Sequence, residues 1–366
     1  MTRFGRQPGR SAVDWQVAAA LAAVADADVG LDEVDTVITG YATTSGHLMP
    51  ADLLAERLGI RPRMAFGMSV GGATGLAMIA QAVHLVRSGA ARTVLVAAGE
   101  DRASGQSRET STQVLAQVGH AEYEVPLGGT VPAYYALLAS RYLWNHGLEA
   151  GANAPIAVQM RAHAVGTEGA HLRGRTTVED VLASRPIADP LRLLDCCPVS
   201  DGGAAFVVSA TRGERAVEVL GTGQAHRHQH LCTLDPQDTG AGRAGRAALA
   251  EAGLEPTGID VFGIYDSFTI TFAMIVEELG LVPAGRAGAE ATAFAVDGRY
   301  PTNTHGGLLS YGHCGVAGGL AHLAEVVAQL RGERAGAQVP GAATGYVHGD
   351  GGVMSAHVAL ALGRPR

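Results

Sequence analysis

The sequence predicts an α/β protein made of two similar lobes that face each other. Short runs of β-branched residues, such as 34–39, alternate with longer alanine- and glycine-rich stretches such as 11–27. The first kind of pattern is typical of buried strands and the second of buried helices. A second observation, an internal duplication, indicates that the chain contains two copies of one α/β unit.

The duplication is visible in two pairs of segments. Gly253-Leu254 and the strand-like run 259–262 repeat the arrangement of Gly30-Leu31 and the run 34–37. A glycine-rich turn followed by an apolar helix occurs at 306–330, and the same pattern occurs at 71–86. Each lobe is therefore expected to place a glycine-rich turn at the start of a buried helix.

The individual elements follow from local patterns. Ser11 is a possible N-cap of the first helix, and Gly59 is expected to end the second. The predicted elements of the first half are helix 11–27, strand 34–39, helix 51–58, helix 75–86, strand 93–97, helices at 131–144 and 156–164, and strand 206–209. The second half is expected to begin near residue 216 and to contain the strand 259–262, the helix 320–330 and an extended segment at 345–352.

Composition excludes several classes of protein. The 366 residues are 47% hydrophobic and 17% charged, which describes a chain with a large buried core. A net charge of -8 does not suggest a nucleic-acid-binding protein. The apolar runs are too short for a membrane span, and the first residues lack the apolar core of a signal peptide. We therefore expect a cytoplasmic protein that binds neither nucleic acid nor membrane.

Lysine is absent from the chain, and all 27 basic residues are arginine. A side-chain Schiff base is therefore impossible, which excludes lysine-imine aldolases and pyridoxal-phosphate enzymes. The four cysteines are unevenly placed and do not suggest a disulfide framework. The vicinal pair Cys196-Cys197 could indicate redox or metal chemistry, but a structural role as small buried hydrophobes is favoured.

The most informative stretch, NTHGGLLSYGHCGVAGG at 303–319, combines a glycine-rich turn with two histidines and precedes the apolar run 320–330. It resembles the signature of the thiolase superfamily, in which an Asn, a Gly-Gly, and a Gly-His-Pro precede a glycine-rich helix start. The matching residues are Asn303, Gly306, Gly307, Gly312, His313, Gly315 and Gly319, while Cys314 stands where the family usually has proline.

The resemblance implies a thiolase fold, in which two pseudo-duplicated lobes form five layers, α/β/α/β/α. The lobes would cover residues 1–212 and 213–366, and the insertion at about 102–190 would shape the substrate pocket and a dimer. The family opens with a strand before its first helix, whereas here only residues 1–9 precede the helix. Either that strand is very short or the chain starts late.

Both cysteines of the catalytic thiolases are replaced. Counted against the motifs of the resembled family, the nucleophilic cysteine falls on Gly72, and the acid/base cysteine falls on His348. Tyr265 takes the place of an oxyanion-supporting Asn or His. Tyr346 lies two residues before His348, so that both side chains would point to one face of an extended strand. A covalent acyl-enzyme is therefore not expected.

His313 and the neighbouring tyrosines suit acid/base chemistry beside a thioester enolate. The set resembles the lipid-transfer-protein-like (SCP-x type) aldolases of the superfamily, which cleave steroid acyl-CoA side chains together with a small OB-fold, zinc-ribbon partner. The resemblance implies retro-aldol cleavage of a β-hydroxyacyl-CoA, with Tyr346 as base and His313 as donor to the enolate oxygen. His348 would assist Tyr346, and Tyr311 and Tyr265 are further catalytic candidates.

The remaining expectations concern ligands and partners. Coenzyme A would enter as part of the substrate, without a covalently bound cofactor or a metal, and Gly72, Asn303, Gly307 and Gly352 would contact the substrate. The chain would form a homodimer, and with the OB-fold partner a heterotetramer. The alternating histidines 226, 228 and 230 could be zinc ligands, although an exposed polar strand or loop is favoured.

Two other functions remain open. A thiolase-type acyltransferase would need a different nucleophile, and Cys314 is the cysteine beside His313. A non-catalytic subunit would bind acyl-CoA or support a complex without turning it over.

Overall fold

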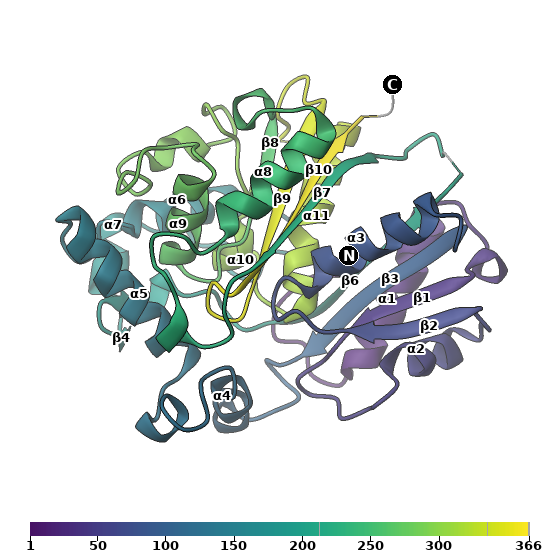
Figure 1. Cartoon of the computed structure of the whole chain (residues 1–366), viewed down its shortest axis with the longest axis horizontal. Coiled ribbons are helices and arrows are strands. Elements are labelled where there is room, and N and C mark those ends of the chain that lie inside the picture. The colour runs from purple at the N-terminus through teal and green to yellow at the C-terminus, as the bar shows by residue number, and fades with distance from the viewer. Residues whose placement is uncertain (212, 335, 365–366) are drawn as a thin grey trace.

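The computed structural model describes residues 1–211, 213–334 and 336–364, and it contains two four-stranded sheets (Figure 1). The first sheet has the order β2-β1-β3-β6 and the second has the order β7-β10-β9-β8. Their bounds are β1 Thr36–Gly40, β2 Met64–Met68, β3 Thr93–Asp101, β6 Asp201–Ser209, β7 Glu218–His226, β8 Val261–Ile264, β9 Thr344–Gly351 and β10 Ala356–Gly363. The predicted lobe boundary falls at residue 212, which lies outside the described residues.

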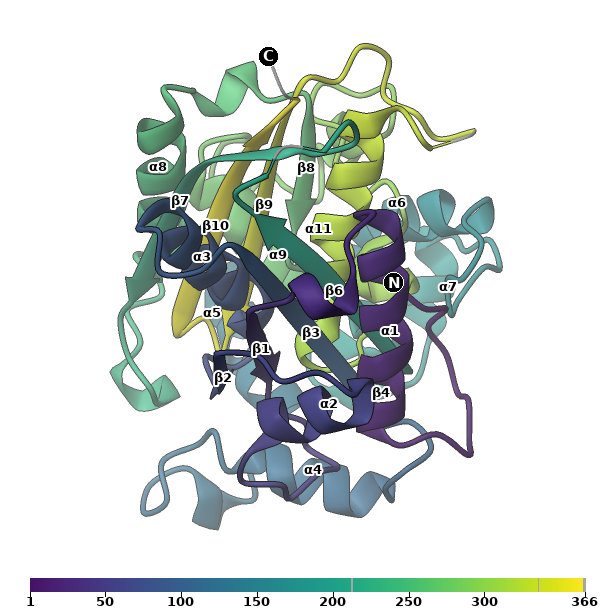
Figure 2. The same ribbon diagram turned by 90° about the vertical axis from the view of Figure 1, so that its right-hand side faces the viewer.

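Helices α3 (Thr74–Arg87) and α11 (Val316–Arg331) lie between the two sheets and contact strands of both (Figures 1 and 2). Helices α1 (Ala12–Asp26) and α2 (Pro50–Leu58) cover the outer face of the first sheet. Helices α8 (Ala241–Ala252) and α9 (Thr269–Glu278) cover the outer face of the second. The predicted five-layer α/β/α/β/α arrangement is therefore confirmed.

The duplication extends to strand pairing. In the first sheet β1 and β3 are parallel and β3 and β6 antiparallel, while in the second β8 and β9 are parallel and β9 and β10 antiparallel. Beside β6, the chain's first residues lie where β7 lies in the other sheet. Thr2 N donates to Gly203 O at 2.9 Å and Asp201 N donates to Gly5 O at 2.8 Å. This short segment lies along the free edge of β6.

Local signals account for several element ends. Ser11 forms the predicted N-cap, and its capping box with Asp14 satisfies backbone groups at the start of α1. Gly59 ends α2 in the left-handed conformation, with φ of 71°. The sequence missed β2, and the strand predicted at 206–209 begins at Asp201, because the DGGAA segment already pairs with β3.

The segment between β3 and β6 forms a separate helical cover at one end of the sheets (Figure 1). It comprises α4 Arg108–Ala116, η2 Val125–Leu127, α5 Val131–His146, α6 Ala154–Val165, α7 Val178–Ala183, β4 Pro186–Ala188, β5 Leu191–Arg192 and η3 Leu193–Asp195. The remaining short elements are η1 Leu31–Glu33, η4 Leu231–Thr233, η5 Pro256–Gly258, η6 Ala291–Phe294 and α10 Gly307–Ser310. None of the helices within the described residues is both long and apolar enough to cross a membrane.

Candidate active site

Side chains predicted from distant parts of the sequence meet where α3 and α11 begin. Tyr265 follows β8, and His313 lies three residues before the first residue of α11. The Tyr265 hydroxyl and His313 Nε2 are 2.8 Å apart, and the two rings meet edge to face. Tyr265 is 4% exposed, whereas His313 keeps part of its surface accessible. The pair therefore offers one buried acid/base group and one partner that solvent or a ligand can reach.

Gly72, just before α3, leaves the space that Tyr265 fills. A Cβ atom at this position would lie 2.1 Å from the Tyr265 hydroxyl and 2.5 Å from the carbonyl oxygen of Asp350. Any side chain larger than hydrogen would therefore collide with the phenol. The hydroxyl of Tyr265 thus stands close to where a thiol at position 72 would stand.

The hydrogen bonds of His313 define its tautomer. Its Nδ1 accepts from the backbone N–H of Gly315 at 3.2 Å, so that Nε2 carries the proton and donates to the oxygen of Tyr265. Burial, with a contribution from Arg102, lowers the pKa of His313 to about 3, which keeps the ring neutral. The O–H of Tyr265 is consequently free to point to another acceptor, such as a substrate oxygen.

Opposing effects act on the ionisation of Tyr265. Burial raises its pKa well above 10, and the Asp350 carboxyl adds to this rise. The Arg102 guanidinium acts in the opposite direction, and it lowers the pKa of His313 as well. Arg102 is therefore the positive charge that would stabilise an anion between the two rings, a role that the sequence analysis did not assign.

The backbone carrying Tyr265 is held by Asn303, which has a left-handed φ of 52°. Its side-chain oxygen accepts from Ile264 N and its amide donates to Ile264 O, both at 2.8 Å. Asn303 is fully buried and both ends of its amide are occupied. It therefore positions the end of β8, whereas the sequence had suggested contact with the substrate.

Gly307 and Gly352, the two other glycines that the sequence placed against the substrate, have packing roles in this structure. A Cβ at Gly307 would lie 2.0 Å from the carboxylate of Asp266, which accepts from Leu308 N at 2.7 Å. A Cβ at Gly71 would lie 2.6 Å from Gly352 N, so the turn at 349–352 packs directly on the turn before α3. Gly307 therefore leaves room for the buried carboxylate of Asp266, and the contact between Gly71 and Gly352 brings the end of β9 to the site.

Comparisons with known proteins agree with this geometry. A family model described as "Thiolase C-terminal domain-like" matches residues 223–364. An acetyl-CoA acetyltransferase of Methanothermobacter thermautotrophicus is 31% identical over 376 residues, covering 98% of this chain and 96% of that protein. The chain belongs to the thiolase family.

Other members of the thiolase family carry different activities. A steroid side-chain-cleaving aldolase of Thermomonospora curvata is 33% identical over 359 residues, which cover 90% of this chain and 88% of that protein. The solved structure of the Ltp2-ChsH2(DUF35) aldolase has a TM-score of 0.85 and 29% identity, covering 100% of this chain and 96% of that chain. The resemblance to the aldolase branch of the superfamily is thereby confirmed, alongside the acetyltransferase relative.

Tyr346 and His348, the predicted base and its helper, lie elsewhere in this thiolase-family chain. Both are fully buried on one face of β9, as the strand alternation predicts. Tyr346 packs against Phe262 at 6.0 Å between ring centroids, and its hydroxyl approaches Gly245 of α8. Neither the Tyr346 hydroxyl nor the ring nitrogens of His348 have a hydrogen-bond partner among the described residues. The structure does not bring this pair to His313, since it faces the outer helices.

Tyr311 also points away from the pair. Its ring contacts Phe4 at 5.0 Å and His305 at 5.2 Å between centroids, and its hydroxyl approaches Gly169. Burial raises its pKa above the ordinary value. Tyr311 therefore packs against the N-terminal segment, although it stands only two residues before His313.

The cysteines and the alternating histidines show no reactive arrangement. All four cysteines are free, and Cys314 is fully buried with a pKa raised well above 9 by burial and by Glu100. A thiol in this state is a poor nucleophile. His226 ends β7 and His228 and His230 lie in the following loop, and no group of three metal-ligating side chains occurs within the residues described.

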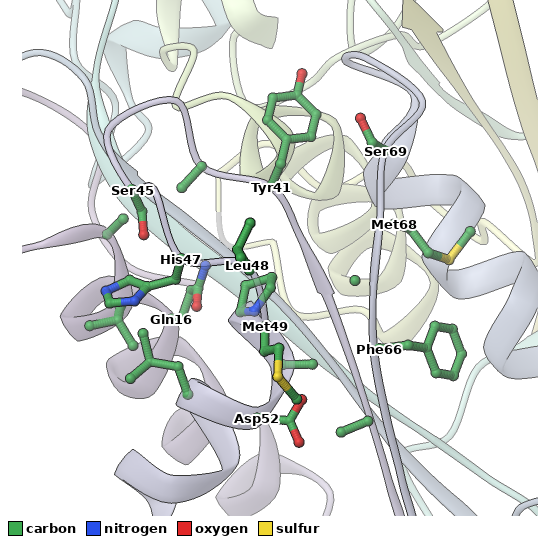
Figure 3. Close-up of a pocket in the computed structure, with 18 residues that line it drawn as sticks. Gln16, Tyr41, Ser45, His47, Leu48, Met49, Asp52, Phe66, Met68 and Ser69 are labelled. Carbon is green, nitrogen blue, oxygen red and sulfur yellow. The ribbon is translucent and has the colours of Figure 1, made fainter.

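A cavity of about 490 Å³ opens beside β2 (Figure 3). Tyr41 and Ser69 line one end of the cavity, and the exposed Leu48 and Met49 also line it. Tyr41 contributes to the raised pKa of Tyr265, which indicates that this end of the cavity lies near the site.

Proposed function

We propose that this chain is an aldolase-type lyase that cleaves a carbon–carbon bond of a β-hydroxyacyl-CoA by retro-aldol chemistry. The observation that carries the proposal is the position of Tyr265, whose hydroxyl fills the space of a nucleophile at Gly72 and bonds His313 at 2.8 Å. The aldolase of Thermomonospora curvata and the Ltp2-ChsH2(DUF35) aldolase support this class of reaction. Coenzyme A would be part of the substrate, and a steroid side chain is the acyl group suggested by that first relative.

In the proposed reaction Tyr265 is the proton-transfer group. Its phenolate would take the proton of the β-hydroxyl group, the carbon–carbon bond would break to give a ketone or aldehyde and a thioester enolate, and the same proton would return to the enolate carbon. The N–H of His313 and the charge of Arg102 would stabilise this phenolate against the burial that raises the pKa of Tyr265. Arg102 would also stabilise the enolate oxygen by its positive charge. His313 here supports the base in place of the donor role to the enolate oxygen expected from the sequence, because its one N–H is given to Tyr265.

An acyltransferase is the second candidate, because the acetyl-CoA acetyltransferase relative is 31% identical. That activity needs a nucleophile, and neither Gly72 nor the buried Cys314 provides one. The lyase is therefore favoured.

We also propose an assembly of two kinds of subunit. The Ltp2-ChsH2(DUF35) aldolase supports a DUF35-type OB-fold partner for this chain. A second copy would cover β2, which pairs with β1 on one side and has no other strand partner among the described residues. The exposed Leu48 and Met49, 98% and 63% exposed, would be buried in that homodimer. The whole assembly would then be a heterotetramer.

The test is turnover of a panel of β-hydroxyacyl-CoAs by the full-length chain with a DUF35-type partner, followed by mass spectrometry. We expect release of a ketone or aldehyde together with a shortened acyl-CoA, and no acylated protein. An acyl group found on the protein would establish the acyltransferase instead. Bound acyl-CoA without any cleavage across the panel would leave a non-catalytic subunit.

A further inference from the structure

Tyr135 of α5 joins the helical cover to the end of β9. Its hydroxyl donates to Asp350 Oδ2 at 2.6 Å and lies 3.3 Å from Gly352 O. Its ring stacks on Phe268 with centroids 4.5 Å apart. Tyr135 and Asp350 are 2% and 1% exposed, so that the contact is sealed from solvent. The segment that the sequence left least interpreted is thus anchored on the end of β9.

The other oxygen of Asp350 faces a histidine across the strand pair. Asp350 and His357 are register partners in β9 and β10, and Asp350 Oδ1 lies 3.9 Å from His357 Nδ1. Neither atom has a hydrogen-bond partner among the described residues. His357 Nε2 is 3.3 Å from the carbonyl of Met354 and must carry a proton to bond it, so Nδ1 presents a lone pair.

A single proton on Asp350 Oδ1 would remove the conflict between this oxygen and the lone pair of His357 Nδ1. If Asp350 were ionised, a carboxylate oxygen would face a lone pair, and both buried atoms would be unsatisfied. If Oδ1 is protonated, it has a proton to share with Nδ1, directly after a small movement or through one water molecule. Burial raises the pKa of Asp350 to about 8 and lowers that of His357 to about 4, which places the proton on Asp350 at neutral pH.

Other titratable groups surround this proton. His348 stands on β9 with Asp350, and its ring centroid lies 5.1 Å from that of His357 on β10. Burial keeps the pKa of His348 well below 6.5. His226 ends β7 and His228 follows it, and the charges of both contribute to the low pKa of His357. Tyr135 faces the carboxyl from α5, and Tyr265 responds to it from the end of β8. Among these groups, Asp350 is the carboxylic acid, and it is therefore the group that holds the proton at neutral pH.

We propose that Tyr135, Asp350 and His357 form a triad that holds one buried proton, and that this proton sets how readily Tyr265 gives up its own. Asp350 and Tyr265 are neighbours, because the backbone carbonyl oxygen of Asp350 and the Tyr265 hydroxyl would lie 2.5 Å and 2.1 Å from a Cβ at position 72, and the charge of the Asp350 carboxyl acts on the Tyr265 hydroxyl. A charged Asp350 would oppose a phenolate at Tyr265, and a neutral Asp350 would permit it. Asp350 is thus a positioning residue, and its effect on turnover rests on the proposed function.

The experiment follows Tyr265 itself by carbon NMR of the full-length chain labelled at tyrosine Cζ. The signal of Tyr265 is identified by its loss in Tyr265→Phe, and its shift is recorded from pH 6 to pH 10. In the wild type we expect a step with a midpoint near pH 8, reporting the ionisation of Asp350. In Asp350→Asn, which imitates the protonated carboxyl, the step should vanish. A step that persists in Asp350→Asn, or is absent from the wild type, would overturn the triad.

Tyr135→Phe is the matched second variant, because it keeps Asp350 and removes one hydrogen bond. The Tyr135 hydroxyl stabilises the ionised carboxylate, so that its loss should move the midpoint of the step to higher pH. An unchanged midpoint would contradict the role of Tyr135.

Turnover is measured on the same samples with the DUF35-type partner. In the wild type we expect kcat/KM to rise with pH and to level off above about pH 8, and in Asp350→Asn to keep rising. Missing turnover with an intact NMR step would refute the proposed function alone. Normal turnover with no Asp350-dependent step would refute the triad alone.

Discussion

Two tyrosine–histidine pairs lie in this molecule, and they differ in what surrounds them. Tyr265 and His313 come from loops 48 positions apart and bond each other at 2.8 Å. Tyr346 and His348 stand two positions apart on β9, and both are fully buried without partners among the described residues. The two pairs have the same composition, but of the two the first combines a shared hydrogen bond with a histidine that is not fully buried, and these properties favour it for acid/base chemistry.

The largest expected difference between the two pairs is in the turnover of Tyr265→Phe and Tyr346→Phe. Tyr265→Phe removes the hydroxyl that His313 holds, and we expect kcat/KM for retro-aldol cleavage to fall by roughly 10²- to 10⁴-fold. Tyr346→Phe removes a hydroxyl that has no hydrogen-bond partner among the described residues, and its kcat/KM should stay within about threefold of the wild type. Steady-state kinetics of both proteins with the same acyl-CoA is the measurement. A larger loss for Tyr346→Phe would restore Tyr346 as the base.

Adding one methyl group at Gly72 should disturb only the first pair. In Gly72→Ala the new Cβ would lie 2.1 Å from the Tyr265 hydroxyl, so that the ring must move away from His313. A misplaced acid/base group costs on the order of 10² in rate. Gly166→Ala is the control, since a Cβ there meets nothing within 4 Å. Equal activity of both alanine variants would show that Tyr265 does not need its position.

A related pair of variants tests whether the Tyr265 side chain excludes a thiol at position 72. Replacing Tyr265 by the smaller asparagine should make room for a thiol at position 72. The double change Gly72→Cys with Tyr265→Asn is then expected to form an acyl-enzyme visible by mass spectrometry, and Gly72→Cys alone is not. Acylation of the single variant would contradict the steric argument drawn from the 2.1 Å contact.

In acid, the two histidines should behave alike. Burial lowers the pKa of His313 to about 3 and that of His348 well below 6.5. An unfolded histidine binds a proton near pH 6.5, so the unfolded state binds more protons than the native state below that pH. Their stabilising effect is present above pH 6.5 and is lost as pH falls, by up to about 1.4 kcal/mol per pH unit for each group.

The free energy of unfolding from urea titrations between pH 7 and pH 5 tests this. His313→Gln and His348→Gln should each flatten the decline, while only His313→Gln should also lower turnover. A decline as steep as that of the wild type in either variant would mean that its histidine is already charged in the native state.

Much of the fold was predictable because it rests on local and periodic signals. The N-cap at Ser11, the left-handed Gly59 and the repeated glycine-rich helix starts all occur as expected. The site was predictable only in part. Motif resemblance pointed to His313 and to position 72, but it ranked Tyr346 ahead of Tyr265, the tyrosine that lies against His313 in the structure.

The reason is geometric. Strand alternation correctly placed Tyr346 and His348 on one face, but it could not show that this face packs on α8, while the opposite face packs on α3 and α11. Asp350 and Tyr135 are in contact although they are 215 positions apart in the sequence, and no local pattern predicts a contact over such a separation. An acidic residue between glycines at the end of a buried strand was the one available hint.

The smallest expected effect concerns stability, and it compares two buried tyrosine hydroxyls. The Tyr346 hydroxyl is desolvated without a partner among the described residues, so that Tyr346→Phe should leave the free energy of unfolding unchanged or raise it by about 1 kcal/mol. Tyr135→Phe loses the bond to Asp350 and should lower it by about 1 to 2 kcal/mol. Urea unfolding midpoints at one pH provide the comparison. If Tyr346→Phe were the more destabilising change, its hydroxyl must bond a buried water molecule, and a water-linked route from Tyr346 towards His348 would have to be reconsidered.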